Sequence, residues 1–95
     1  MRRAETSGLT WAYIYFMKDE AERVREAAPH HARYWSETGF AKRAGPFNDR
    51  SGGLIIIDAA DEEAAGQMVS GDPFQRAAVL EQSWLKAWEP TDDPR

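Results

Sequence analysis

Cysteine is absent from the 95 residues of the sequence. Its absence excludes disulfide bonds, thiolate metal sites and cysteine nucleophiles from the chemistry of the protein. Long apolar runs are absent as well, whereas a membrane-spanning helix needs roughly 18 consecutive apolar residues. Residues 1–8 also lack the apolar segment of a secretory signal. We therefore expect a cytoplasmic protein without a membrane partner.

An excess of positive charge is also missing. The sequence has 12 Lys and Arg residues against 16 Asp and Glu residues, so its net charge is -4, and the basic residues are scattered among carboxylates. A surface that binds nucleic acid needs concentrated positive charge to neutralise phosphates. No glycine-rich strand-to-helix junction is present, so Gly52-Gly53 is predicted to be a turn and not a phosphate-binding loop. The composition predicts no nucleic-acid partner.

Aromatic residues, by contrast, are abundant, with four Trp, three Tyr and four Phe. A domain of this size buries only about 60–65% of the surface that its unfolded chain exposes. An uncovered sheet face would therefore carry large apolar side chains, and exposed apolar patches of that kind are typical of interfaces. We expect a homodimer, formed face to face.

Hydrophobic periodicity predicts one domain between flexible polar tails at residues 1–8 and 90–95. Apolar residues alternate along the first strand, whereas in the helices they recur at a spacing of three or four. The order of elements, β-α-β-β-α-β, is typical of the ferredoxin-like α+β fold, in which the helices lie on one face of an antiparallel sheet. The predicted elements are strands at 9–17, 40–47, 54–59 and 79–89, helices at 19–38 and 61–70, and a short helix after residue 72.

Three residues mark the predicted ends and breaks of the helices. Asp19 is placed to cap the first helix, although it could also supply a second carboxylate to a site. Pro29 removes a backbone hydrogen bond, so we expect two helical pieces that meet near it. Asp72 precedes Pro73 and stands three positions before Gln75, which is typical of an N-cap with a capping box.

The stretch PHHARYW at residues 29–35 resembles the histidine-bearing first helix of the YciI-like (YCII-related) family, which belongs to the dimeric α+β barrel superfamily. Further matches follow in order and spacing: AGPF at 44–47, SGGLII at 51–56, GDPF at 71–74 and WLK at 84–86. The resemblance covers most of residues 10–90 and indicates one YciI-like domain at 9–89. It implies a ferredoxin-like fold, a dimer and a site centred on a histidine and an aspartate, although many members have no assigned activity.

Two histidines stand where the family usually has one, and we favour His31 over His30 as the site residue. His31 shares a helix face with Tyr34, Trp35 and Thr38, whereas His30 lies one step around the helix and is expected to be exposed. Adjacent helical residues point about 100° apart, so the pair cannot chelate a metal together. The alternative role of His31 is that of a structural histidine.

Asp72 is the predicted carboxylate partner of the histidine, with helix capping alone as the alternative. Arg50 could clamp an anion and Ser51 could donate a hydroxyl, although most of this segment could equally be a plain hairpin loop. Tyr34 and Trp35 are predicted to line the binding site, although aromatic residues at helical spacing more often belong to a core. We expect no cofactor and no metal.

Two functions from different classes fit these residues. The first is a small cofactor-free enzyme that transfers protons on a cyclic metabolite, of isomerase or lyase type, with His31 as base or acid and Asp72 as its orienting group. The resemblance supports this function, because proteins of the same fold include a lactone isomerase and a dehydrochlorinase. The second is a non-catalytic module that binds a small molecule or joins a larger enzyme, for which a pocket alone is enough.

Overall fold

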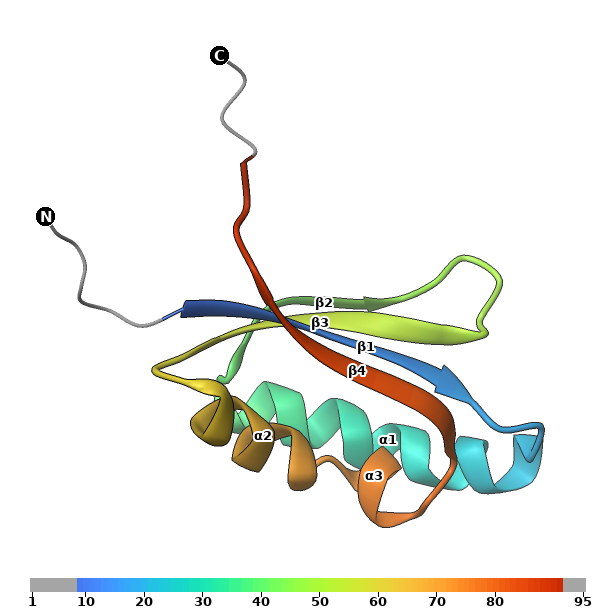
Figure 1. Ribbon diagram of the computed structural model, residues 1–95. Helices are drawn as coiled ribbons and strands as arrows, with labels where there is room; N and C mark the ends of the chain where they lie inside the picture. The colour runs from blue at the N-terminus through green and yellow to red at the C-terminus, as the bar shows by residue number, and fades with distance from the viewer. Residues whose placement is uncertain (1–8, 92–95) are drawn as a thin grey trace, which may run out of the picture.

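A four-stranded antiparallel sheet with three helices on one face makes up the protein over residues 9–91, the part that this computed structural model describes (Figure 1). The predicted tail at 1–8 and residues 92–95 of the predicted tail at 90–95 lie outside the described residues. Within residues 9–91, no helix is long and apolar enough to cross a membrane. The elements are β1 (Leu9–Met17), α1 (Ala21–Thr38), β2 (Ala41–Pro46), β3 (Gly52–Ala59), α2 (Glu62–Ser70), α3 (Pro73–Arg76) and β4 (Leu80–Trp88).

The strand order is β2-β3-β1-β4, and each neighbouring pair is antiparallel. This order and the placement of the helices confirm the predicted ferredoxin-like α+β fold. β1 lies inside the sheet, where Tyr13 faces Ile55 of β3 on one side and Leu85 of β4 on the other. The central strand therefore supplies the middle row of the core. The side chains of β1 that face the helices are buried: Trp11, Tyr13 and Tyr15. Those on the opposite face are half-buried: Ala12, Ile14 and Phe16.

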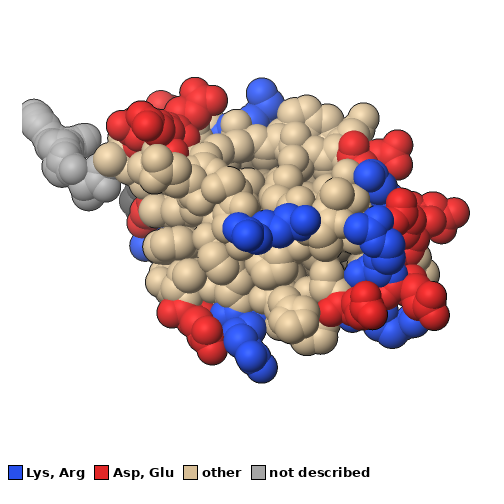
Figure 2. Space-filling view, turned by 90° about the horizontal axis from the view of Figure 1, so that it is seen from below, with Lys and Arg blue, Asp and Glu red and all other residues tan. Residues whose placement is uncertain are grey.

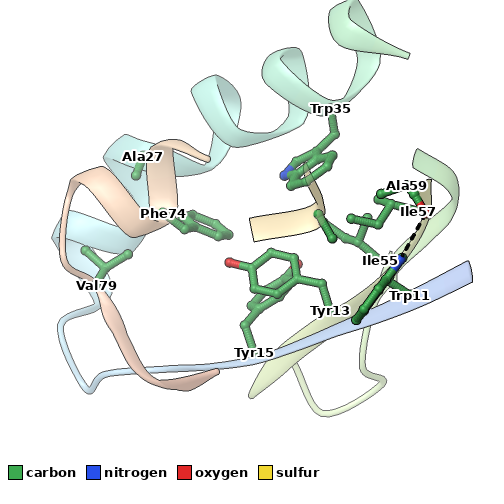
Figure 3. Close-up of a cluster of buried hydrophobic side chains, with 11 residues drawn as sticks. Trp11, Tyr13, Tyr15, Ala27, Trp35, Ile55, Ile57, Ala59, Phe74 and Val79 are labelled. Carbon is green, nitrogen blue, oxygen red and sulfur yellow. Dashed lines mark hydrogen bonds between the residues drawn. The ribbon is translucent and has the colours of Figure 1, made fainter. Parts of the chain in front are cut away.

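The core fills the space between the sheet and the helices (Figure 3). Tyr13 and Tyr15 project from β1 toward the helices, where Trp35 of α1 and Phe74 of α3 meet them. Trp11 donates from its indole Nε1 to the Ala59 carbonyl oxygen at 3.2 Å. Two tyrosine hydroxyls thus lie inside an apolar core, and buried hydroxyls need hydrogen-bond partners. The partners that they find define the candidate site.

Helix α1 runs unbroken from residue 21 to residue 38, so the predicted division into two pieces at Pro29 is wrong. The proline removes only the bond that its N–H would have donated to the Arg25 carbonyl. Both residues are exposed, so water can take the place of the missing donor. Ala27 and Trp35, on either side, are buried against the core and hold the two halves in line. Tertiary packing outweighs the local break.

The start of α1 lacks the predicted cap from Asp19, which is exposed in the bend before the helix. Glu20 occupies the N-cap position, but its side chain accepts no bond from the helix backbone. It pairs instead with Arg23, whose Nη1 lies 2.6 Å from the Glu20 Oε1. Arg23 also donates to the Ala77 carbonyl oxygen, which ties the first turn of α1 to the end of α3. A tertiary contact therefore replaces the local cap.

Gly52 and Gly53 begin β3 and do not form the predicted turn. Both are buried, and Gly53 pairs with Tyr15 across the sheet. A Cβ at Gly52 would overlap the Tyr15 carbonyl oxygen, and a Cβ at Gly53 would overlap the Tyr15 hydroxyl. The two glycines therefore allow β3 to approach β1 closely and leave room for the tyrosine ring over the sheet.

Candidate functional site

Asp72 is a fully buried carboxylate at the start of α3. Its Oδ1 accepts a hydrogen bond from the Phe74 backbone N–H at 3.0 Å, which confirms the predicted N-cap. The predicted capping box is wrong, because the Gln75 side chain donates to the Tyr13 hydroxyl at 3.0 Å and to the Ser83 hydroxyl at 3.3 Å. Capping thus explains one of the hydrogen bonds that Asp72 accepts, and the others come from residues distant in sequence.

His31 meets Asp72 directly, with 2.7 Å between the His31 Nδ1 and the Asp72 Oδ1. The two residues are 41 positions apart and come from α1 and α3, so the fold brings them together. Because a carboxylate only accepts hydrogen bonds, the Nδ1 must carry a proton, and in the neutral form of such a ring the Nε2 holds the lone pair. The histidine side chain keeps 14% of its surface exposed, whereas the carboxylate has none.

Two tyrosines of β1 complete the hydrogen-bonded group. The Tyr13 hydroxyl donates to the Asp72 Oδ2 at 3.1 Å, and the Tyr15 hydroxyl lies 3.3 Å from the His31 Nε2. Burial, and next the charge of Asp72, raises the pKa of Tyr13 above its usual range. The same two causes raise the pKa of Tyr15 to about 12. Both tyrosines therefore keep their protons near neutral pH and serve as hydrogen-bond donors.

Aromatic packing fixes the plane of the imidazole. The Phe74 ring stacks on the His31 ring with 4.0 Å between centroids and 17° between planes. The Tyr15 ring stands edge-on to the imidazole at 5.5 Å, and it also contacts Phe74. The histidine is thus held by a hydrogen bond at the Nδ1, a stacked ring on one face and a hydroxyl at the Nε2. Such fixed orientation is what a general base requires.

The other predicted site residues of α1 have different contacts. The Tyr34 hydroxyl donates to the Met68 carbonyl oxygen at 2.6 Å. Gly71 leaves room for it, because a Cβ there would lie 2.5 Å from that hydroxyl. Trp35 packs in the core against Tyr13 and Tyr34, and among the described residues its buried Nε1 has no hydrogen-bond partner. The binding roles of Tyr34 and Trp35 stay predictions.

Arg50 and Ser51 lie in the loop between β2 and β3. The Ser51 hydroxyl and backbone N–H both donate to the Asp49 Oδ1, at 2.7 and 3.0 Å, and these bonds lower the pKa of Asp49. Arg50 is exposed and takes a left-handed backbone conformation, with φ of 65°. Asp49 therefore accepts both hydrogen bonds of Ser51 within the loop, and neither the Arg50 nor the Ser51 side chain is hydrogen-bonded to His31. Their predicted roles in binding stay predictions.

The exposed position of His30 separates the two histidines. His30 lines a hollow between α1 and α3 together with Arg23 and Arg76, whereas His31 contacts the buried carboxylate. Within residues 9–91, no three His, Cys, Asp or Glu side chains come together as a metal site requires. The contact that distinguishes His31 is therefore its hydrogen bond to Asp72.

Sequence reasoning missed Tyr13, Tyr15 and Gln75 as members of the site. A signal was present, because the two tyrosines alternate with the half-buried residues of β1 and so share the buried face of that strand. Buried tyrosine hydroxyls need polar partners. Two of them on one face of a strand predict a polar group beneath the helices. Gln75 carried no such signal, because its side chain reaches residues 62 and 8 positions away.

Charged side chains on the helical face follow the scattered pattern of the sequence. Figure 2, which looks onto this face, shows acidic and basic groups interspersed around the rim and a mostly uncharged middle that some basic atoms cross. The described part of this face therefore carries charges of both signs and not a single positive or negative patch.

The protein is thus a small α+β domain of the ferredoxin-like kind, with a histidine–aspartate contact between its helices. The YCII-related domain matches residues 9–89, and the chain belongs to this family. No curated protein matches the chain. A solved structure of 5-chloro-2-hydroxyhydroquinone dehydrochlorinase from Burkholderia phenoliruptrix, in complex with 2,5-dihydroxybenzoquinone, is similar with a TM-score of 0.73 and 17% identity. That match covers 85% of this chain and 94% of the other, and it shows a shared fold.

The raised pKa values predict that the protein loses stability in alkali. The unfolded chain releases tyrosine protons near pH 10, whereas the folded chain retains them, so the free energy of unfolding should fall above about pH 10. Tyr15→Phe should reduce this fall by up to about 1.4 kcal/mol per pH unit. Urea unfolding of both proteins at about pH 9 and about pH 11 measures the difference. An equal fall of the free energy of unfolding between the two pH values in both proteins would contradict the burial of Tyr15 as a neutral phenol.

Proposed function

We propose that this protein is a cofactor-free cytoplasmic enzyme that transfers protons on a small cyclic metabolite, of isomerase or lyase type. The observation that carries the proposal is the orientation of His31 by Asp72, at 2.7 Å, with the Nε2 edge turned to the Tyr15 hydroxyl. An imidazole held at one nitrogen by a buried carboxylate is the usual arrangement of a general base.

Proton transfer at this site follows from the hydrogen bonds. The neutral His31 uses the lone pair of its Nε2 to take a proton from a substrate carbon, and the ring becomes an imidazolium. Asp72 stabilises that cation through the Nδ1–H bond and keeps its own position through the bonds from Tyr13 and the Phe74 N–H. The proton then returns to another carbon in an isomerisation, or a leaving group departs in an elimination.

The comparison with the dehydrochlorinase supports the choice of reaction class. That protein shares the fold, carries the name of an enzyme that removes hydrogen chloride, and holds 2,5-dihydroxybenzoquinone, a single small ring. Removal of hydrogen chloride needs a base that takes a proton from the substrate, and that proton transfer needs no bound cofactor. A ligand of similar size therefore suits the single base of the present protein.

A non-catalytic binding module is the second candidate, and the open face of the sheet favours it. A hollow on that face is lined by apolar side chains such as Phe47, Leu54 and Trp88 together with charged ones, and neither His31 nor Asp72 lines it. A ligand bound there would not meet the histidine–aspartate pair. Binding in this hollow would survive the loss of the histidine, and this separates the two candidates.

We also infer a homodimer that buries the open face of the sheet. Trp84 and Trp88 of β4 keep 42% and 46% of their surface exposed. Trp84 lies beside Phe16 and the half-buried Ile14 of β1. The helices all lie on the opposite face (Figure 1). A second copy would remove both indoles from water, and aromatic residues of this kind are typical of interface cores.

Light scattering at micromolar concentration tests the dimer. The expected mass is about twice the 10.8 kDa of one chain. Trp84→Glu should shift the protein toward the monomer, because a carboxylate would be desolvated at the interface. The exposed Glu37→Gln on α1 serves as the control and should leave the mass unchanged. A mass near 10.8 kDa for the unmodified chain excludes the dimer.

Deuterium exchange into cyclohexanone in heavy water, followed by NMR, tests the catalytic proposal. The protein should accelerate exchange at the carbons next to the carbonyl, and His31→Gln should lower that rate by about 10²–10⁴-fold. His30→Gln is the matched control, because it alters the neighbouring exposed histidine, and it should exchange at the full rate.

Two outcomes would overturn this assignment. Exchange at the same rate in the His31→Gln variant would remove the base from the mechanism. If the unmodified protein and the His31→Gln variant both bind 2,5-dihydroxybenzoquinone and neither accelerates exchange, the protein is a binding module instead. Circular dichroism of each variant shows that a loss of exchange does not come from a loss of folding.

A further inference from the structure

The Tyr15 hydroxyl lies beside the His31 Nε2, and it makes no other hydrogen bond within the site. Its oxygen lies 3.3 Å from the Nε2, which is long compared with the roughly 2.8 Å of a strong hydroxyl hydrogen bond. The Tyr13 hydroxyl, by contrast, donates to Asp72 and accepts from Gln75, so both of its roles are occupied. Tyr15 can therefore exchange its weak bond for a bond to a bound molecule.

The position of the Tyr15 hydroxyl is fixed by the strand beside it. The Tyr15 ring lies over Gly53 of β3. Only glycine leaves room for the ring at this position, because a Cβ there would overlap the Tyr15 hydroxyl. On the other sides it contacts the rings of Tyr13, Phe74 and His31. The ring is thus held, while the proton can turn about the C–O bond. A donor fixed in this way needs no reorganisation when charge develops next to it.

The charge state suits a donor. A phenol is protonated at neutral pH, and burial extends this state into alkali by raising the pKa of Tyr15 to about 12, so the hydroxyl is a constant donor of one O–H bond. His31 beside it has the opposite property, a lone pair at the Nε2. The site thus places one proton acceptor and one hydrogen-bond donor side by side, from α1 and β1 respectively.

We propose that Tyr15 is a second catalytic residue, whose hydroxyl donates to the oxygen of an enolisable carbonyl substrate while His31 takes the proton from the adjacent carbon. This inference rests on the proposed function. It narrows the substrate class to small molecules in which an acidic C–H bond adjoins a carbonyl group, because these present a proton to His31 and an oxygen to Tyr15 at the same time.

The step balances without a further reactant. The C–H bond breaks and an N–H bond forms at the His31 Nε2, while the electron pair of the C–H bond forms a carbon–carbon double bond. The carbonyl π pair moves to oxygen, which becomes an enolate oxyanion. The Tyr15 O–H donates a hydrogen bond to that oxyanion and keeps its proton. Asp72 stabilises the imidazolium, so the positive and negative charges that the step creates each have a partner.

Tyr15→Phe tests the proposal, because it removes the oxygen and keeps the ring. In the cyclohexanone exchange assay, the expected result is a kcat lower by about 10²–10³-fold, the usual effect of losing one oxyanion donor. The KM should change by less than about threefold, since the bond strengthens in the transition state. Introducing 3-fluorotyrosine at position 15 restores a donor and should restore most of the rate.

The outcomes distinguish this proposal from the one on which it rests. If His31→Gln abolishes exchange and Tyr15→Phe leaves kcat unchanged, the tyrosine is not catalytic and the base assignment stands. If His31→Gln leaves exchange unchanged, both proposals fail. A Tyr15→Phe loss that 3-fluorotyrosine does not recover would mean that the ring packing matters and not the donated hydrogen bond. Thermal unfolding followed by circular dichroism identifies any variant that does not fold.

Discussion

A carboxylate with no exposed surface is the constraint around which the helical side of the protein is arranged. Burying an ionised carboxylate without partners costs several kcal/mol or more, so Asp72 must receive hydrogen bonds. Three donors from three elements supply them: the Phe74 N–H of α3, the Tyr13 hydroxyl of β1 and the Nδ1–H of His31 on α1. One side chain thus joins the sheet to both helices that cover this part of it, and the site and the core are the same structure.

The remaining contacts follow from this one. The Tyr13 hydroxyl is fixed by two hydrogen bonds, because it accepts one from Gln75 and donates one to Asp72. The stacked Phe74 ring and the edge-on Tyr15 ring leave the imidazole one orientation, with its Nε2 toward the phenol. A network in which every member is satisfied is rigid. The proposed proton transfer requires such a rigid site.

Much of the fold could be predicted, because hydrophobic periodicity and residue spacing are local properties. The alternation along β1 and the N-cap that Asp72 supplies to α3 were both predicted from local spacing, and both are present in the structure. The pairing of His31 with Asp72 was also predicted, from resemblance and geometry. The failures concern residues whose neighbours are distant in sequence. Pro29 lies in a helix that its tertiary contacts keep straight, and Gly53 serves a tyrosine on another strand.

The hydrogen bond between His31 and Asp72 carries the account, and the tautomer of the imidazole reports on it most directly. Long-range proton–nitrogen NMR of the neutral ring distinguishes a proton at the Nδ1 from a proton at the Nε2. The structure predicts that the proton lies at the Nδ1 in the unmodified protein, held by the carboxylate, and that Asp72→Asn weakens this preference. A neutral His31 with its proton at the Nε2, or with the same mixture of tautomers in both proteins, would contradict the account.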